Sequence, residues 1–195
     1  MTMQRRVLVI NGHPDGDPAR LCAALAEAYA QGAREAGHSV ETISIAGLDI
    51  PYLRTQQEFE QGGIPEHLAE AGEAVRRAEH VVIVFPLWLG TMPAMLKSFL
   101  EQVLRPGVAF EYGDKGPKTL LSGRSARMVV TMGMPAFVYR LYFLSHGVAG
   151  LRRSILRFVG FNPVRTTLIG MVTMGGSDKQ SKWPARMKAL GRRAE

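Results

Sequence analysis

Cysteine is nearly absent from this chain, since Cys22 is the single one among 195 residues. An intrachain disulfide is therefore excluded, and the fold does not depend on an oxidising compartment. Long apolar runs are also missing. The longest uncharged stretch, residues 80–96, is interrupted by Pro86, Gly90 and Pro93 and is shorter than the ~20 apolar residues of a spanning helix. The amino-terminal segment lacks a signal-peptide pattern. We therefore expect a cytoplasmic protein without an integral membrane segment.

The motifs of several enzyme classes are missing as well. The glycine spacing matches neither GxGxxG nor GxxxxGK[ST], so neither a Rossmann dinucleotide site nor a P-loop is indicated. No serine lies in a GxSxG motif. The five histidines show no metal-ligand spacing, and we expect no metal site. Basic pairs are scattered along the chain, which favours solvated surfaces over a nucleic-acid groove.

The composition is that of one folded domain, which we expect to span residues 1–195. Hydrophobic residues make up 46% of the chain and charged residues 21%, so a disordered chain is excluded. The formal net charge of +7 favours anionic partners such as phosphorylated cofactors.

Strand and helix patterns alternate along the chain. Short apolar or alternating runs predict five strands, at 6–11, 39–45, 80–85, 126–132 and 164–172. Helical spacing predicts helices from Leu21 to about Ala36, from Pro65 onward, from Pro93 onward with the proline in the first turn, and over 182–193. Residues 46–63 read as a long loop, 105–123 as a small hairpin, and 136–158 as one broken helix or two short ones. This alternation predicts a parallel sheet with helices on both faces, an α/β fold of three layers.

Ligands of such sheets bind beyond the carboxyl ends of the strands. The loop 12–20 follows the first strand and leads into a helix, whose amino terminus favours a phosphate. Arg20 adds a positive charge there and His13 a donor. A tight turn made by the glycines and prolines of this loop is the equally weighted alternative.

Two further loops follow buried strands. The segment FPLWLGTMP places Trp88 at the edge of the expected crevice, where apolar walls and backbone donors suit a flat heteroaromatic ring. The alternative is that Trp88 is a core residue, the commoner fate of such a tryptophan. The segment TMGMP offers Gly133 for close backbone approach, and its alternative is a simple turn. For Cys22, a packing role is favoured over catalysis.

Several of these segments together resemble the flavodoxin-like NAD(P)H:quinone oxidoreductase family. The resemblance rests on the first strand with His13-Pro14, FPLWLGTMPAMLKSFLEQVL, FEYGDKGP, TMGMPAFVY and a late FVGF. It implies the strand order 2-1-3-4-5, in which the three loops converge on one crevice. It also implies a non-covalent flavin, FMN or FAD, in that crevice.

The resemblance extends to single residues. Arg20, Leu21 and Cys22 stand where the family contacts the flavin phosphate. The loop Pro86, Leu87, Trp88, Leu89 and Gly90 resembles the one whose backbone lines the flavin ring. The segment under the ring corresponds to Thr131, Met132, Gly133 and Met134. Tyr139 matches a tyrosine at the pyrimidine edge of the flavin, and His146 resembles the active-site histidine of the family; both are expected to be catalytic.

The activity implied is hydride transfer from NAD(P)H through the flavin to quinones or related electrophiles. A regulatory flavoprotein that docks on a membrane transporter is the alternative, and an electron-carrier flavodoxin is disfavoured by the basic charge. The family forms homodimers. Because 136–158 is apolar around nearly its whole circumference, we expect it to bury a second face in a two-fold dimer.

Overall fold

The computed structural model describes residues 3–113, 116–172 and 177–195. Five parallel strands form one sheet in the order β2-β1-β3-β6-β7. Their bounds are Ser39–Ser44 for β2, Arg6–Asn11 for β1, His80–Pro86 for β3, Ser125–Thr131 for β6 and Val164–Ile169 for β7. Counted without the hairpin strands, this is the order 2-1-3-4-5 that the family resemblance implies, and that expectation is confirmed.

Burial follows the position of each strand in the sheet. Every residue of β3 and β6 is buried, as expected of central parallel strands covered on both faces. At one edge, β2 keeps only partial burial along its length. Its polar residues therefore face solvent without breaking the core.

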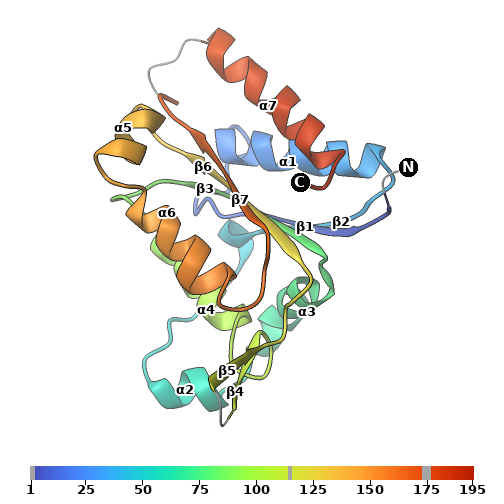
Figure 1. Ribbon diagram of the computed structural model, residues 1–195, viewed down its shortest axis with the longest axis vertical. Coiled ribbons are helices and arrows are strands. Elements are labelled where there is room, and N and C mark those ends of the chain that lie inside the picture. Colours follow the sequence, from blue (N-terminus) through green and yellow to red (C-terminus); the bar gives the residue numbers. More distant parts are fainter. Residues whose placement is uncertain (1–2, 114–115, 173–176) are drawn as a thin grey trace.

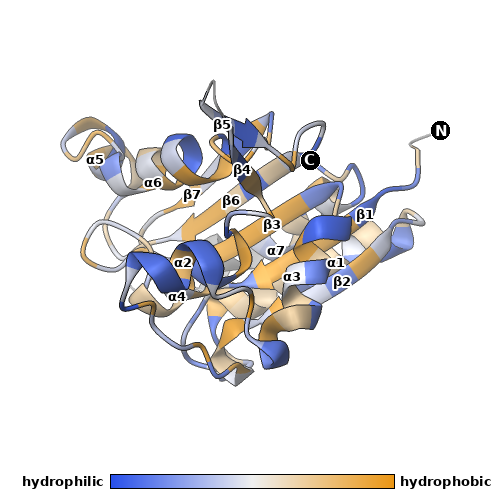
Figure 2. Ribbon diagram, turned by 90° about the horizontal axis from the view of Figure 1, so that it is seen from below, coloured by the Kyte–Doolittle hydropathy of each residue, from blue (hydrophilic) through white to orange (hydrophobic). Residues whose placement is uncertain are grey.

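Helices cover both faces of the sheet (Figure 1). On one face lie α1 (Leu21–Glu35) and α7 (Ser177–Gly191), which pack against each other. Apolar residues of α3 (Ala69–Arg77), α4 (Ala94–Val103) and α6 (His146–Gly150) belong to the core on the opposite face. The hydropathy colouring in Figure 2 shows the apolar strands enclosed between these helices. The three-layer prediction is confirmed.

The segment predicted as a long loop, 46–63, contains helical structure. A short 3-10 turn, η1, spans Ile45–Gly47, and α2 spans Gln56–Gln61. The Thr55 hydroxyl accepts a 3.1 Å hydrogen bond from the Glu58 amide, and the Glu58 carboxylate accepts one of 2.9 Å from the Arg54 amide. This resembles a capping box, so the loop prediction was wrong at these residues. A further 3-10 turn, η2 (Glu66–Leu68), precedes α3.

Other predicted bounds shift by a few residues. Pro93 precedes the first turn of α4 as its N-cap. Strand β7 ends at Ile169, before Met171 adopts a left-handed φ of 60° that no strand accommodates. Helix α7 begins at Ser177, earlier than predicted. The predicted hairpin is present as β4 (Phe110–Gly113) and β5 (Gly116–Thr119); Asp114 and Lys115 of FEYGDKGP lie outside the described residues.

The segment 136–158 is broken into two helical parts, one of the two predicted alternatives. Helix α5 spans Ala136–Leu141, and α6 continues into a π-helical stretch, η3, at Leu151–Leu156. Between them Leu144 and Ser145 both have positive φ, 49° and 52°. Residues other than glycine rarely adopt this left-handed backbone conformation. Here it turns the chain sharply between the two helical parts.

Candidate active site

The three predicted loops meet at the carboxyl edge of the sheet. The Gly12 amide donates to the Val84 carbonyl at 2.7 Å, which joins the end of β1 to β3. The Leu87 amide donates to the Thr131 carbonyl at 2.7 Å, which joins β3 to β6. The rings of His13 and Trp88 lie edge to face with centroids 5.8 Å apart. The loops after β1, β3 and β6 therefore form one continuous rim.

Side chains shape the loop between β1 and α1. The Asn11 side chain accepts from the His13 amide, and His13 Nδ1 accepts from the Asp15 amide at 3.0 Å. The carboxylates of Asp15 and Asp17 continue the pattern, each accepting at 2.9 Å from the amide two residues on. The short polar side chains after β1 thus hold this loop as a series of turns.

Arg20 is not the free positive charge that we expected. Its guanidinium lies 2.7 Å from an Asp15 oxygen at Nε and 3.9 Å from an Asp17 oxygen. Two hydrogen bonds to the Asp15 carboxylate hold its pKa below the usual value. The larger effect comes from the Asp17 amide and the second from the Arg20 guanidinium. These are exposed pairs, which hold a side chain weakly. Arg20 therefore balances two acidic neighbours, a pairing that the sequence pattern did not predict.

The amino terminus of α1 has no side-chain cap and no acidic residue in its first turn. The first amides of a helix lack helical partners, and here Leu21, Cys22 and Ala23 donate to no other group of the described chain. The Cys22 thiol is buried and lies 3.3 Å from the Thr131 hydroxyl, and burial raises its pKa to about 11. Its side chain therefore packs against β6 as a neutral thiol, while its amide remains available to an anion.

The loop after β3 is a tight turn that projects two apolar side chains. The backbones of Trp88 and Thr91 bond to each other at 2.9 and 3.0 Å. Leu89 and Gly90 at the tip both have positive φ, 47° and 83°, which a two-residue turn of this hand requires. Trp88 is 48% exposed and Leu89 is fully exposed. The interpretation of Trp88 as a core residue is therefore wrong.

The loop after β6 is held from the side of β7. The Met132 amide donates to the Ile169 carbonyl at 2.8 Å, and the Met171 amide donates to the Met134 carbonyl at 3.1 Å. Gly170, which the sequence did not single out, allows this approach, because a Cβ there would lie 2.4 Å from the Ala136 nitrogen. Thr131 and Met132 are buried, Met134 is partly buried, and Gly133 is exposed.

Four backbone amides at this rim have no acceptor among the described residues. They are those of Leu89, Gly90, Gly133 and Met134. Leu89 and Gly133 are exposed, and Gly90 and Met134 are partly buried. Backbone donors that lack a protein acceptor and gather at one edge suit a ligand with several acceptors. The oxygens and nitrogens of a flavin ring are such acceptors, and the uncapped α1 terminus suits its phosphate. The residues present therefore fit a flavin mononucleotide.

Tyr139 is buried and its hydroxyl is bonded on both sides. It donates to the Gly90 carbonyl at 2.9 Å and accepts from the Val148 amide at 3.2 Å. Burial raises the pKa of Tyr139, against the opposing effect of the Val148 and Gly147 amides. Gly147 lies so close to the loop that a Cβ would be 2.2 Å from the Gly90 carbonyl oxygen. Tyr139 and Gly147 together fasten α5 and α6 to the turn after β3.

An open cavity of about 420 Å³ adjoins this turn. We call it the aromatic cavity; its lining residues are Leu89, Gly90, Thr91, Tyr139, Tyr142, Phe143, His146 and Gly147. His146 is exposed, and its ring bonds to no other described group. The structure thus brings His146 beside the turn, whereas Arg20 and Cys22 belong to the α1 end of the rim.

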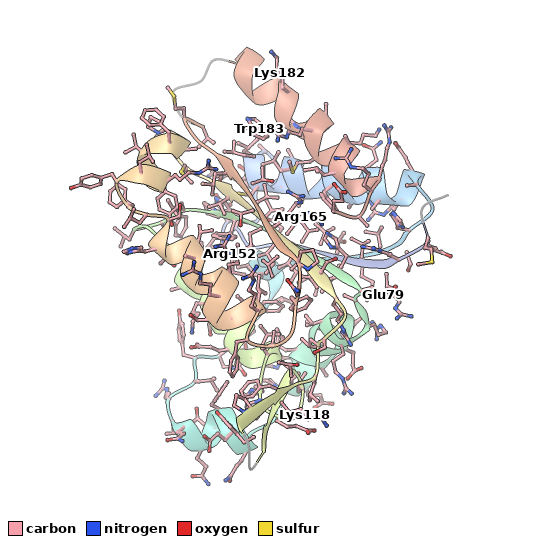
Figure 3. All side chains as sticks on the ribbon, viewed as in Figure 1. Glu79, Lys118, Arg152, Arg165, Lys182 and Trp183 are labelled. Atoms are coloured by element: carbon pink, nitrogen blue, oxygen red, sulfur yellow. The ribbon has the colours of Figure 1, made fainter. Side chains whose placement is uncertain are left out.

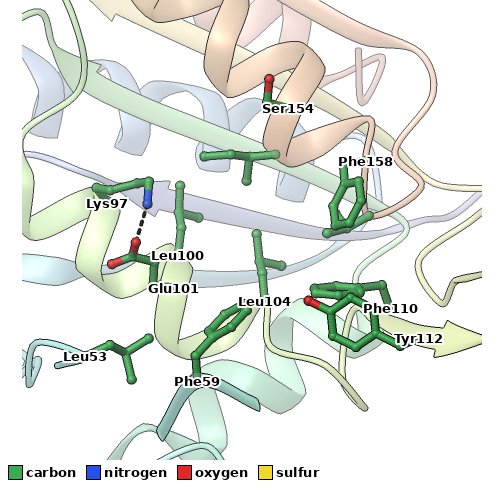
Figure 4. Close-up of a pocket in the computed structure, with 12 residues that line it drawn as sticks. Leu53, Phe59, Lys97, Leu100, Glu101, Leu104, Phe110, Tyr112, Ser154 and Phe158 are labelled. Atoms are coloured by element: carbon green, nitrogen blue, oxygen red, sulfur yellow. Dashed lines mark hydrogen bonds and ion pairs between the residues drawn. The ribbon is translucent and has the colours of Figure 1, made fainter. Parts of the chain in front are cut away.

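A second apolar cavity of about 390 Å³ lies apart from the rim, between α4, η3 and the β4–β5 hairpin (Figure 4). The Phe110 ring packs edge to face against Phe158 there, at 4.9 Å, and Lys97 pairs with Glu101 at its mouth. None of the predicted site residues lines it. We therefore assign the site to the strand ends.

No group of three or more histidine, cysteine, aspartate or glutamate side chains is placed to hold a metal ion in the described part of the chain. Within the same residues, no helix has the length and apolar character to cross a membrane.

Comparison with known proteins places this geometry in context. The chain is 34% identical over 133 residues to an FMN-dependent NADH:quinone oxidoreductase of Azotobacter vinelandii, covering 68% of this chain and 64% of that protein. It is 25% identical to one of Nitratidesulfovibrio vulgaris, over 88% of this chain and 89% of that protein. The alignment with the first relative thus spans a little under two thirds of its length.

Solved structures share the fold. An NAD(P)H:quinone oxidoreductase from Methanothermobacter marburgensis superimposes with a TM-score of 0.80 at 22% identity, covering 99% of this chain and 97% of that one. An FMN-dependent NADH-azoreductase from Bacillus anthracis, in complex with FMN, gives 0.77 at 16% identity, covering 97% and 99%. A family model described as "Flavodoxin-like fold" matches residues 5–194. The chain therefore belongs to this family of flavodoxin-like proteins.

Proposed function

We propose that the protein is a flavin-dependent oxidoreductase that binds FMN non-covalently, takes electrons from NADH and reduces quinones. The observation that carries the proposal is the set of unpaired amides at the converging loops, supported by the activities for which the relatives are named. FAD and NADPH remain alternatives that belong to the same test. We expect it to work in the cytoplasm, as predicted from the sequence.

Different residues of the rim would bind the two parts of the flavin, its phosphate and its ring. The amides of Leu21, Cys22 and Ala23 would hold the phosphate, with Arg20 balancing Asp15 and Asp17 beside it. The amides of the two turns, at Leu89–Gly90 and Gly133–Met134, would bond the ring. Trp88 and Met134 would supply apolar walls.

A flavin held there would supply two-electron chemistry, the transfer of a hydride from a dihydronicotinamide to a quinone, which with a proton from solvent becomes a hydroquinone. The chain's part is to hold a slot and orient fixed dipoles toward developing negative charge. The single O–H of Tyr139 already donates to the Gly90 carbonyl. We therefore assign Tyr139 to positioning the turn after β3 rather than to stabilising negative charge. The ring of His146, which bonds to no other described group, lines the aromatic cavity and can donate to a substrate oxygen there.

We also propose a two-fold dimer that covers the apolar surface of α5 and the following turn. Five large side chains lie exposed there: Phe137, Leu141, Tyr142, Phe143 and Leu144, at 66%, 70%, 80%, 44% and 62%. Exposed apolar patches of this kind usually mark interfaces. Sedimentation of the flavin-loaded protein at micromolar concentration tests this, and a monomer with full activity would contradict it.

The activity is tested by reconstituting the purified protein with FMN or FAD and measuring NADH and NADPH oxidation with a soluble quinone. Rapid turnover supports the enzyme, with the preferred pair identifying the natural cofactors. Tight flavin binding with negligible turnover would overturn the proposal in favour of a regulatory flavoprotein that docks on a transporter.

A further inference from the structure

A cavity of about 430 Å³ lies between α6, η3 and the edge strand β7, and no residue of it other than His146 belongs to the predicted site. Figure 1 shows these helical segments beside β7. We call it the arginine cavity; its lining residues are Arg140, Leu144, Ser145, His146, Val148, Ala149, Arg152, Arg153, Thr166 and Leu168. No acidic residue is among them.

The three arginines of this cavity have no counter-charge among the described residues. None of Arg140, Arg152 and Arg153 takes part in an ion pair or a side-chain hydrogen bond with another described residue. Seven arginines elsewhere in the described residues do form ion pairs, as Arg6 does with Glu79 and Arg77 with Glu41. Like charges around a cavity repel one another and attract an anion into it.

Two polar atoms in the walls are buried without a partner. Nε of Arg152, a residue that Figure 3 labels on the helix beside β7, and the hydroxyl of Thr166 on β7 bond to no other described group. Unpaired buried donors are uncommon and costly. An N–H and an O–H in the residues of these walls thus lack an acceptor, and guanidinium groups bind phosphate with particular strength.

Backbone conformation points to the same place. Arg152 and Arg153 lie in the π-helical stretch η3, and π-helical segments are rare and frequent at functional sites. The sharp left-handed pair Leu144–Ser145 forms the neighbouring wall. Strained residues of this kind cluster at binding sites.

His146 lines both the arginine cavity and the aromatic cavity. A ligand can therefore place a ring among Tyr142 and Phe143 while an attached anion reaches the arginines. We propose that the arginine cavity binds the oxyanion group of a substrate whose ring occupies the aromatic cavity. The assignment to a substrate rests on the proposed function; the anion site itself does not.

The anion site is tested by calorimetric titration of the flavin-loaded protein with inorganic pyrophosphate. We expect Arg152→Gln/Arg153→Gln to weaken binding about tenfold or more, because two charge-assisted contacts are lost. Arg157→Gln is the matched control, since Arg157 is exposed on the same segment and does not line the cavity. Thr166→Val removes one hydroxyl at constant shape and should weaken binding less. Absence of binding, or equal affinity in the double variant, would overturn the site.

Steady-state kinetics identify which substrate carries the anion. If it is the dinucleotide, the double variant raises KM for NADH but not for N-benzyl-dihydronicotinamide, which has no phosphate. If it is the acceptor, KM rises for a naphthoquinone sulfonate but not for menadione. Unchanged KM values with pyrophosphate binding lost would overturn the link to a substrate. A wild-type protein without turnover would refute the proposed function, and the titration would still decide the anion site.

Discussion

The Tyr139 hydroxyl joins α5 to the turn after β3 by a 2.9 Å hydrogen bond to the Gly90 carbonyl. The Val148 amide completes the arrangement by donating to the same hydroxyl. One buried side chain thus fixes the turn that carries the unpaired amides of Leu89 and Gly90. The rim of the site depends on α5 and α6 as much as on its own loops.

Tyr139→Phe removes both bonds without changing the shape of the ring. We expect a loss of about 1–3 kcal/mol in unfolding free energy, because the Gly90 carbonyl and the Val148 amide lose their partner. Flavin affinity should fall as well, since the turn loosens. Thermal or denaturant unfolding and a flavin titration check both effects. A variant that is less stable but binds flavin with unchanged affinity would show that the bond has no role at the site.

Trp88→Ala should lower flavin affinity while leaving the stability of the fold nearly unchanged. The side chain is half exposed, so its loss should change unfolding free energy by less than about 1 kcal/mol, while flavin affinity falls. Binding of flavin should also quench Trp88 fluorescence. The measurement is cleanest in a Trp183→Phe background, because Trp183, which lies under Arg186 in α7, is the other tryptophan. A strongly destabilised apo-protein with normal flavin affinity would show that Trp88 has a packing role and does not contact the flavin.

Arg20→Glu should weaken flavin binding by about tenfold, because it leaves Asp15 and Asp17 unbalanced and adds a third carboxylate beside the phosphate. Arg34→Glu is the control: Arg34 forms an exposed pair with Glu27 near the other end of α1. Fluorescence titration with FMN at low and high salt measures the effect, which salt should reduce. Equal affinities of the two variants would remove Arg20 from the phosphate end.

His80 should make the fold sensitive to acid. It is fully buried between the Tyr29 hydroxyl, at 3.0 Å, and the Ser125 hydroxyl, at 2.7 Å. Burial, and then the nearby charges of Arg127, Arg5 and Arg165, lower its pKa to about 3. Between about pH 6.5 and pH 3, His80 is therefore protonated in the unfolded chain but neutral in the folded one. The free energy of unfolding falls as the pH drops through this range.

The contribution of His80 is at most on the order of 5 kcal/mol across that range. Unfolding free energies at pH 7 and pH 4 should differ less in His80→Gln than in the wild type. His67→Gln provides a control, because His67 is exposed. An unchanged pH dependence in His80→Gln would exclude His80 as the acid-sensitive group.

Much of the architecture is predictable from local pattern. The apolar run at His80–Pro86 must be buried on both faces, and the strand order followed from the family resemblance. Helix α2 was missed because its segment, QQEFEQ, is polar, although Thr55 and Glu58 carry the capping signal. The site was predicted as three loops, yet the pairing of Arg20 with Asp15 was not. Such contacts depend on loop conformation, as do the close approaches at Gly147 and Gly170, which no periodicity records.

The central claim is that the rim formed by the three loops holds a flavin in position to exchange hydride. Anaerobic mixing of the FMN-reconstituted protein with NADH tests it most directly, with the visible absorption of the bound flavin as the signal. The account predicts rapid bleaching that a soluble quinone then reverses. A bound flavin that stays oxidised in the presence of excess NADH would contradict it.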